Sequence, residues 1–237
     1  MSQPLPSRKK EESIENMFAD IAHRYDFLNH LLSFGVDTQW RNQAVKLALK
    51  DSPKSILDVA TGTGDLAIAL KRAMPSSRVS GIDFSAGMLK FAKEKSKKKA
   101  LDIDFRVGDG QNIDFADNSF DLVTIAYGIR NFSDRDLGLR EFYRVLKPNG
   151  KLIILEFPPP EKDFFGRLFS FYFLKLSPYI AGLISGRRDA YEYLGRSVLE
   201  FPKAEEFTAI IANAGFTQTS FKKQLFGVSV LYYGEKQ

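Results

Sequence analysis

The stretch LDVATGTGDLA, residues 57–67, joins a short apolar run to a helical segment, and it decides the fold. Gly62 and Gly64 let the backbone turn sharply and approach a ligand closely. The N–H groups at the start of the following helix favour polar or negatively charged ligand groups. Asp83 ends the next apolar run, where its carboxylate is placed to accept hydrogen bonds from a ribose diol. This combination predicts a nucleotide-binding α/β sheet.

Strand-like and helical patterns alternate on both sides of this turn. The expected strands span 55–60, 78–83, 103–109, 120–128 and 151–157. The expected helices after the turn reach about residue 74 and span 86–99, 134–147 and 203–214. Strands that alternate with helices indicate a parallel sheet covered on both faces. Residues 216–226 and 227–236 predict two further strands in an antiparallel hairpin around Gly227.

Two segments lie outside this alternation, and both are expected to be helical. Residues 1–50 form a predicted N-terminal cap, with two or three helices between Ser13 and about Lys50 and a break near Gly35. Residues 158–200 form a predicted insertion or lid that contains the aromatic run FFGRLFSFYFLKLSPYIAGLIS. We expect the whole chain, residues 1–237, to form a single domain with these two additions.

Composition restricts the classes of function. The chain has no cysteine, which excludes disulfides, thiolate nucleophiles and cysteine-based zinc sites, and it has two histidines. His23 and His30 are seven residues apart, and no cluster of carboxylates accompanies them, so we expect no metal site.

The net charge of +5 can attract nucleic acid, anionic lipid or an anionic ligand. No RNA-binding module is evident, no apolar run is long enough to span a membrane, and residues 1–13 lack a secretory signal, so we expect a cytoplasmic protein.

The residues around the turn favour a cationic nucleotide-like ligand over a dinucleotide. Asp58 lies at the strand end, where its charge would repel a pyrophosphate, and Ala67 replaces the third glycine of the dinucleotide pattern. A sulfonium ion attached to adenosine fits better, which identifies S-adenosylmethionine as the expected cofactor. In GDG, residues 108–110, Asp109 is then expected to face the adenine amine, with the Gly110 backbone nearby. A dehydrogenase is the alternative, and comparing the binding of S-adenosylmethionine with that of NAD would separate the two.

The chain resembles the demethylmenaquinone and 2-polyprenyl-benzoquinol C-methyltransferases of quinone biosynthesis over about residues 14–236. The blocks IAHRYDFLNHLLSFG (21–35) and YGIRNF (127–132) are the most specific to that family. The other shared blocks are LDVATGTGDLA, GIDFSAGML, FYRVLKPNGKLIILEF and AGF. The resemblance implies a Rossmann-like class I methyltransferase fold with a mostly parallel seven-stranded sheet. One departure is EFPPP, residues 156–160, which is richer in proline than is usual in the family.

Carried over by position, Thr63, Asp83 and Asp109–Gly110 match the family's cofactor contacts. The complete predicted cofactor-binding set is Asp58, Gly62, Thr63, Gly64, Asp83, Asp109 and Gly110. We expect residues 21–35 to cap the cofactor and help to build the acceptor pocket, with Tyr25, Asn29 and Tyr127 as pocket residues. His30 is expected to be structural.

Methyl transfer to a quinol carbon requires the enzyme to position the ring, stabilise a phenolate and remove the displaced ring proton. Arg130 is the candidate for stabilising the phenolate because its charge is permanent, and Asn131 could orient the substrate or the loop. Alternatively, Arg130 serves only as a salt-bridge partner for an acid such as Asp134. His23 is the tentative proton acceptor, and Tyr25, Asp26 and a bound water are alternatives.

The expected partner is a polyprenyl quinol. We favour methylation of demethylmenaquinol to menaquinol, with 2-methoxy-6-polyprenyl-benzoquinol as the alternative acceptor. A non-catalytic protein that binds S-adenosylmethionine or a quinone is the alternative from another class. The aromatic insertion and the lysine run KEKSKKK, residues 93–99, suggest peripheral contact with the anionic inner face of the membrane, although such runs are more often solvated helix faces. The sequence is also compatible with a homodimer.

Overall fold

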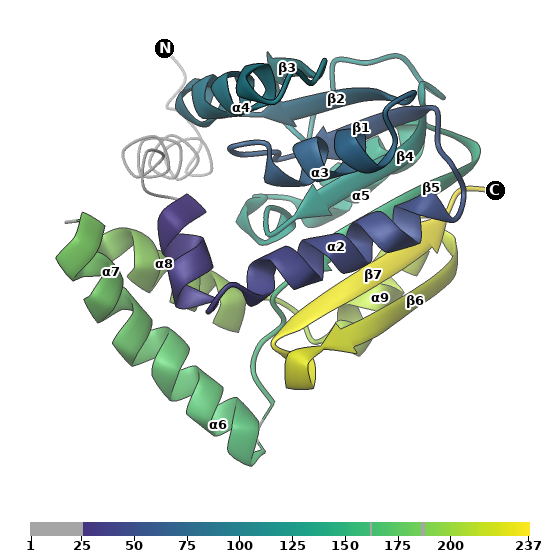
Figure 1. Cartoon of the computed structure of the whole chain (residues 1–237). Helices are drawn as coiled ribbons and strands as arrows, with labels where there is room; N and C mark the ends of the chain where they lie inside the picture. Colours follow the sequence, from purple (N-terminus) through teal and green to yellow (C-terminus); the bar gives the residue numbers. More distant parts are fainter. Residues whose placement is uncertain (1–25, 162, 186–187) are drawn as a thin grey trace, which may run out of the picture.

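The computed structural model describes residues 26–161, 163–185 and 188–237. Its centre is a seven-stranded sheet with the strand order β3-β2-β1-β4-β5-β7-β6 (Figure 1). The strands are β1 (Ser55–Val59), β2 (Arg78–Asp83), β3 (Asp104–Val107), β4 (Phe120–Ala126), β5 (Leu146–Glu156), β6 (Thr217–Gln224) and β7 (Ser229–Glu235). Strands β1 to β5 pair in parallel, whereas β7 runs antiparallel to both β5 and β6. The predicted mostly parallel sheet with a C-terminal antiparallel hairpin is confirmed.

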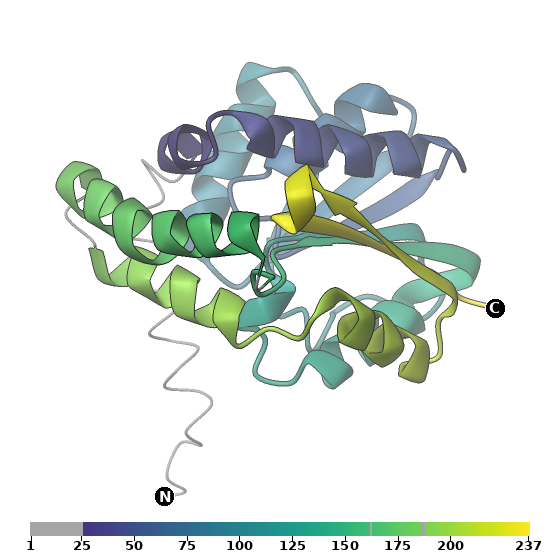
Figure 2. The ribbon, with the colours of Figure 1, turned by 90° about the horizontal axis from the view of Figure 1, so that it is seen from below.

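Helices cover both faces of this sheet. One layer contains α2 (Val36–Leu49), α3 (Asp65–Ala73) and α4 (Ala86–Lys98), and the other contains α5 (Arg135–Val145) and α9 (Ala204–Asn213) (Figure 2). Alternate residues of β4 point into opposite layers: Leu122 packs with α2 and α3, and Val123 packs with α5 and α9. A strand that is buried on both faces needs a continuous apolar sequence. This explains why the predicted strands are apolar runs in which polar residues do not alternate with apolar ones.

The two predicted additions are helical in the described residues. Residues 26–32 form a helical segment, and Phe34 and Gly35, both with positive φ, separate it from α2. The insertion after β5 comprises α6 (Phe164–Phe171), the π-helical turn η2 (Tyr172–Leu176), α7 (Ser177–Ser185) and α8 (Arg188–Leu199). The N-terminal segment and the insertion pack against each other, because Leu28 and Ala181 form a small core of their own. None of the described helices is long and apolar enough to cross a membrane.

One strand boundary differs from the prediction. We expected β5 to begin at Lys151, after a helix ending at Lys147, but Leu146 already pairs with Phe120. The pairing then shifts register, so that Leu122 faces Lys151. The residues between form an irregularity rather than a clean helix-to-strand turn, because Pro148 and Asn149 break the helix while both ends of the segment remain on β4.

Candidate active site

The glycine-rich turn and the end of β2 are connected through one carboxylate. The Gly62 N–H donates to Asp83 Oδ2 at 2.7 Å, and the Ser85 N–H donates to Asp83 Oδ1 at 2.9 Å. Asp83 is nearly buried, with 6% of its surface exposed. The structure therefore places this carboxylate in a fixed orientation at the carboxyl end of the sheet, where open α/β sheets bind ligands.

The two glycines of the turn have different surroundings. Both have positive φ, 57° at Gly62 and 82° at Gly64. A Cβ atom at Gly64 would lie 3.0 Å from both Ala92 Cβ and Phe105 Cζ, whereas at Gly62 it would meet only Met88 Cε at 3.5 Å. Gly64 thus permits close packing of α3 against its neighbours, and Gly62 leaves the backbone open to a ligand.

Asp58 stabilises the glycine-rich turn through side-chain hydrogen bonds. Its residue is 1% exposed, and its two oxygens accept hydrogen bonds from the hydroxyls of Thr61 at 2.6 Å and Thr124 at 2.7 Å. Burial raises the pKa of Asp58 to about 6, although the two hydroxyl donors oppose this shift. These two hydrogen bonds join the turn to β4, and the place of Asp58 in the cofactor site stays a prediction.

Asp109 and Gly110 also differ from each other in role. Asp109 is exposed at the sheet edge, and its Oδ1 accepts from the Gln111 N–H at 2.8 Å. Gly110 is buried, and a Cβ there would lie 2.4 Å from Phe132 Cζ and 2.7 Å from Val59 Cγ1. Gly110 is therefore required by packing, while the Asp109 carboxylate remains accessible to a ligand.

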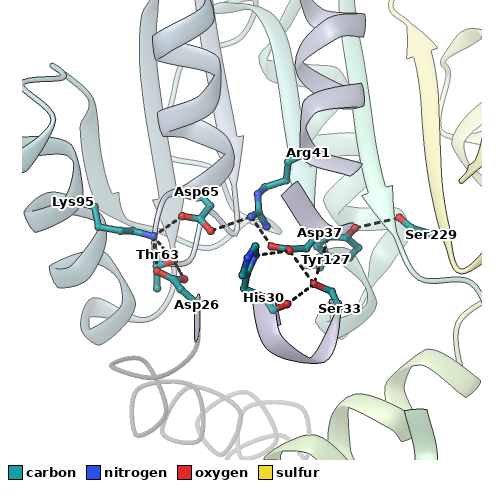
Figure 3. Close-up of polar contacts among 10 residues, drawn as sticks. All are labelled: Asp26, His30, Ser33, Asp37, Arg41, Thr63, Asp65, Lys95, Tyr127 and Ser229. Carbon is teal, nitrogen blue, oxygen red and sulfur yellow. Dashed lines mark hydrogen bonds and ion pairs between the residues drawn. The ribbon is translucent and has the colours of Figure 1, made fainter. Parts of the chain in front are cut away.

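A chain of ion pairs connects the turn to the N-terminal segment (Figure 3). Lys95 Nζ lies 2.6 Å from Asp26 and 2.5 Å from Asp65, and Arg41 lies 3.5 Å from the same Asp65 and 2.6 Å from Asp37. These residues come from the N-terminal segment, α2, α3 and α4. The network fixes the segment over the turn, as expected of a cofactor cap.

Thr63 lies inside this network. Its hydroxyl donates to Asp26 Oδ1 at 2.5 Å and accepts from Lys95 Nζ at 3.0 Å. The structure thus engages Thr63 with the N-terminal cap, and this predicted cofactor contact is untested.

His30 lies at the other end of the network. Its Nδ1 is 3.1 Å from Asp37 Oδ1, and the Ser33 hydroxyl donates to the same oxygen at 2.8 Å. Burial acts to raise the pKa of Asp37, but Arg41, Ser33 and His30 together lower it below its ordinary value. Asp37 is therefore a stable anion that holds the break between the N-terminal segment and α2. His23 and Tyr25 lie outside the described residues.

A pocket of about 200 Å³ opens between α2, the ends of β4 and β5, the insertion and the β6–β7 hairpin. Its wall is largely aromatic: Trp40, Tyr127, Phe157, Phe169, Tyr172 and Phe173. Polar side chains on the wall include Asn29, Ser33, Asp37, Arg41 and Arg130. We call this the ring pocket. Two of the predicted pocket residues, Asn29 and Tyr127, line it.

Tyr127 forms one flat wall of the ring pocket. It follows β4 with φ of 57°, and its ring stacks on Phe157 with centroids 4.3 Å apart. Its hydroxyl is 3.2 Å from Ser229 Oγ on β7. Burial raises the pKa of Tyr127 far above its ordinary value, so the phenol stays protonated at neutral pH. Tyr127 can therefore offer a flat surface and a hydrogen-bond donor, but not a base.

Arg130 lies in the 3₁₀ turn η1 (Ile129–Asn131), with its side chain 2% exposed. Its Nη1 donates to Glu156 Oε1 at 2.7 Å and to the carbonyl of Tyr127. The alternative salt bridge with Asp134 does not form, because Asp134 caps α5 by accepting from the Leu137 N–H. Among the described residues, the buried Nε of Arg130 has no hydrogen-bond partner. Arg130 thus brings a permanent positive charge to the wall of the ring pocket.

Asn131 is not among the described residues that line the ring pocket, and its role in orienting the substrate or the loop stays a prediction. Its Oδ1 accepts a hydrogen bond from the Tyr193 hydroxyl of α8 at 3.2 Å. Asn131 thus ties the turn that carries Arg130 to the insertion.

Several site residues were not identified from the sequence. Lys95 belongs to the lysine run that we interpreted as a surface feature, yet it lies one turn after the buried Ala92 on the inner face of α4. That helical spacing was the available signal. Glu156, which is 0% exposed, could not be identified as a site residue, because nothing in the sequence indicates that Arg130 lies beside it.

The comparisons with known proteins agree with this geometry. A model of the ubiE/COQ5 methyltransferase family matches residues 7–236. A demethylmenaquinone methyltransferase of Thermus thermophilus is 48% identical over 220 residues, which cover 93% of this chain and 100% of that protein. The ubiquinone/menaquinone biosynthesis C-methyltransferase UbiE of Geobacter sulfurreducens is 49% identical over 231 residues, covering 96% of this chain and 90% of that protein.

Solved structures share the architecture at lower identity. The crystal structure of a SAM-dependent methyltransferase from Thermotoga maritima gives a TM-score of 0.69 at 21% identity, covering 94% of this chain and 100% of that chain. At this identity the likeness shows the fold alone.

Proposed function

The chain belongs to the ubiE/COQ5 methyltransferase family, and from this we propose that it transfers a methyl group from S-adenosylmethionine to a ring carbon of a polyprenyl quinol. The acceptor that we propose is demethylmenaquinol, which would give menaquinol, as the name of the Thermus thermophilus relative suggests. The observation that carries the proposal is an aromatic pocket beside a buried arginine at the carboxyl end of the same sheet that carries the glycine-rich turn.

The residues around the turn fit S-adenosylmethionine. Asp83 offers a fixed carboxylate for ribose hydroxyls, the open backbone at Gly62 admits a ligand, and Asp109 adds an accessible acceptor. These acids suit a ligand whose sulfonium is positively charged. When bound, the cofactor supplies an electrophilic methyl group.

The ring pocket suits a flat, electron-rich acceptor. Tyr127 and Phe157 stack 4.3 Å apart and present aromatic faces against which a quinol ring can pack. Arg130 lines this pocket, and in this proposal its permanent positive charge stabilises the negative charge of a phenolate. The negative charge of Glu156, 2.7 Å away, holds the guanidinium in place.

The identity of the group that removes the ring proton stays a prediction. His23 is the tentative candidate from the sequence, and it lies outside the described residues. Replacing His23 with Ala should slow methyl transfer without weakening the binding of S-adenosylmethionine. An unchanged rate would remove His23 from the mechanism.

The direct test is a methylation assay with reduced demethylmenaquinol and S-adenosylmethionine, in which the product is identified by mass spectrometry. A parallel assay uses 2-methoxy-6-polyprenyl-benzoquinol, the acceptor suggested by the ubiquinone branch of the UbiE name. Cofactor binding without methylated product from either ring would refute the proposal and favour a carrier. In cells that lack the gene, the accumulated precursor should be the demethylated form of the accepted ring.

We further propose that the insertion contacts the membrane in which such a substrate resides. Large apolar side chains of α6 and α7 are exposed, including Phe164, Leu168, Phe171, Tyr179 and Leu183, and basic Arg167 and Lys175 lie among them. The lysine run on α4 lies apart from α6 in Figure 1, so the two do not form one continuous surface. Flotation with anionic vesicles at low salt tests this proposal, and absence of binding would reject it. The homodimer and the cytoplasmic location stay predictions.

A further inference from the structure

A second pocket adjoins the ring pocket on the side away from the glycine-rich turn. Its volume is about 280 Å³, and it shares Phe169, Tyr172, Leu225 and Val228 with the ring pocket. We call the second space the exit pocket.

The exit pocket is lined almost entirely by apolar groups. Pro158, Pro160, Leu168 and Phe226 are among the residues that line it. Among the described residues of the lining, only Glu161 is charged, and it pairs with Lys223 of β6 at 2.6 Å. The unusual proline-rich segment after β5 thus forms part of the wall of the exit pocket, and its prolines have no backbone N–H donor.

The rim of the exit pocket exposes apolar side chains, and part of it has an unfavourable backbone conformation. The tip of the β6–β7 hairpin, η3 (Leu225–Gly227), has φ of 41° at Leu225, 53° at Phe226 and 86° at Gly227. Left-handed conformations are unfavourable for leucine and phenylalanine. Phe226 is nevertheless 78% exposed, and Leu168 across the rim is 57% exposed. Figure 2 shows this tip, in yellow, beside the start of α6.

We propose that the exit pocket binds the apolar tail of the acceptor, which leaves the ring pocket between Tyr172 and Val228 and emerges between α6 and the hairpin tip. This inference rests on the proposed function, because it requires an acceptor with a long hydrocarbon substituent. Three observations select this occupant: the space shares four lining residues with the pocket that suits the ring, its charged lining residue Glu161 is paired with Lys223, and its outer rim presents apolar side chains to the surroundings.

Steady-state kinetics with two acceptors test the proposal. One acceptor carries a polyprenyl tail, and the other is the same quinol ring without a tail. The double variant Leu168→Gln/Phe226→Asn removes both apolar rim groups, and asparagine tolerates the left-handed backbone at position 226. We expect kcat/KM for the tailed acceptor to fall at least tenfold, while that for the tail-less ring changes less than twofold.

The control is Leu49→Gln, which replaces an exposed leucine at the end of α2 that lines neither pocket and lies outside the insertion. It should leave both acceptors unaffected. Equal losses for both acceptors, or no loss for the tailed acceptor in the double variant, would overturn the tail site. Unaltered kinetics with a changed oligomeric state in light scattering would assign the rim to a second copy of the chain and would also overturn it.

A binding measurement separates this inference from the proposed function. A tailed quinone carrying a diazirine on its first isoprene unit is photolysed with the wild-type protein, and the labelled peptides are mapped. Label on residues 158–173 or 224–228 supports the tail site, and label confined elsewhere overturns it. If wild type methylates neither acceptor, the proposed function fails; if it methylates both and the label maps elsewhere, only the tail site fails.

Discussion

The glycine-rich turn and the ring pocket lie at the same end of one sheet, but their contacts span very different lengths of sequence. At the turn, Asp83 accepts hydrogen bonds from Gly62 and Ser85, which lie 21 and 2 positions away in the sequence. Asp58 accepts one from Thr61, which lies 3 positions away. In the ring pocket, Tyr127 meets Ser229 across 102 positions, and the Tyr172 hydroxyl donates to the Leu32 carbonyl across 140. The glycine-rich turn and Asp83 are therefore built mostly from local contacts, with Thr124 as a distant partner of Asp58, while the ring pocket combines residues that are far apart in the sequence.

The largest expected effect concerns Arg130. Arg130→Ala should lower turnover at least 100-fold, about 3 kcal/mol, while cofactor affinity measured by calorimetry changes less than threefold. The same substitution leaves Glu156 as an uncompensated buried charge, which costs roughly 3–5 kcal/mol of stability. The variant Arg130→Met/Glu156→Gln removes both charges at similar volume and controls for unfolding. Wild-type turnover in that folded variant would eliminate Arg130 from the chemistry.

Asp83 should show the opposite pattern. Asp83→Asn retains an acceptor for one N–H but loses the charge, which weakens its hydrogen bonds to ribose hydroxyls by about 2 kcal/mol. We expect a rise of about 30-fold in the dissociation constant for S-adenosylmethionine, measured by calorimetry, and nearly unchanged turnover at saturating cofactor. A lower turnover at saturation would mean that the two sides of the site are not separable.

Asp58 gives the turn a pH-dependent stability. Its pKa is about 6 in the folded protein and 3.8 in the reference state, so its contribution is fully present below pH 3.8 and is lost as the pH rises through 6. Asn cannot titrate. The difference in unfolding free energy between wild type and Asp58→Asn should therefore decrease by about 2 kcal/mol from pH 4.5 to 7.5. Parallel pH profiles in urea denaturation would contradict this.

The two glycines of the turn provide a matched pair. Gly64→Ala should lower the free energy of unfolding by about 2 kcal/mol, from its left-handed backbone and the 3.0 Å approach to Ala92 and Phe105. Gly62→Ala should lower it by about 1 kcal/mol, because only the backbone term applies. Cofactor affinity should fall more for Gly62→Ala. The reverse order in either measurement would contradict the conclusion that Gly62 is open to a ligand and that Gly64 is closely packed.

The smallest effect is expected at the connection between the two sides. Lys95→Met removes the ion pairs with Asp26 and Asp65, whose side chains are each 38% exposed. Partly exposed pairs contribute about 0.5 kcal/mol, and 0.5 M salt should remove the difference from wild type. The KM for the cofactor should rise about threefold at low salt because the cap is less firmly held. An effect insensitive to salt would indicate packing rather than charge.

The difference in sequence separation also explains what could be predicted. The strand-turn-helix pattern at residues 57–67 and the acid at Asp83 follow from local spacing, and the structure places them together. The sequence could not show that Asp58 bonds to Thr124 or that Gly110 makes room for Phe132, because these partners are brought in by β4 and by the residue that follows η1. The burial of Arg130 beside Glu156 is likewise a product of the register between β4 and β5.

The position of β7 has a consequence for how the chain matures. β7 lies between β5 and β6, so the apolar edge of β5 acquires its partner only when residues 229–235 are available. Roughly 70 residues separate the two strands, a delay of several seconds at ordinary rates of synthesis. During that interval β5 presents an unpaired edge to other chains. The central sheet is thus completed only once residues 229–235 have been made, and the nascent chain is most open to aggregation while the insertion is being made.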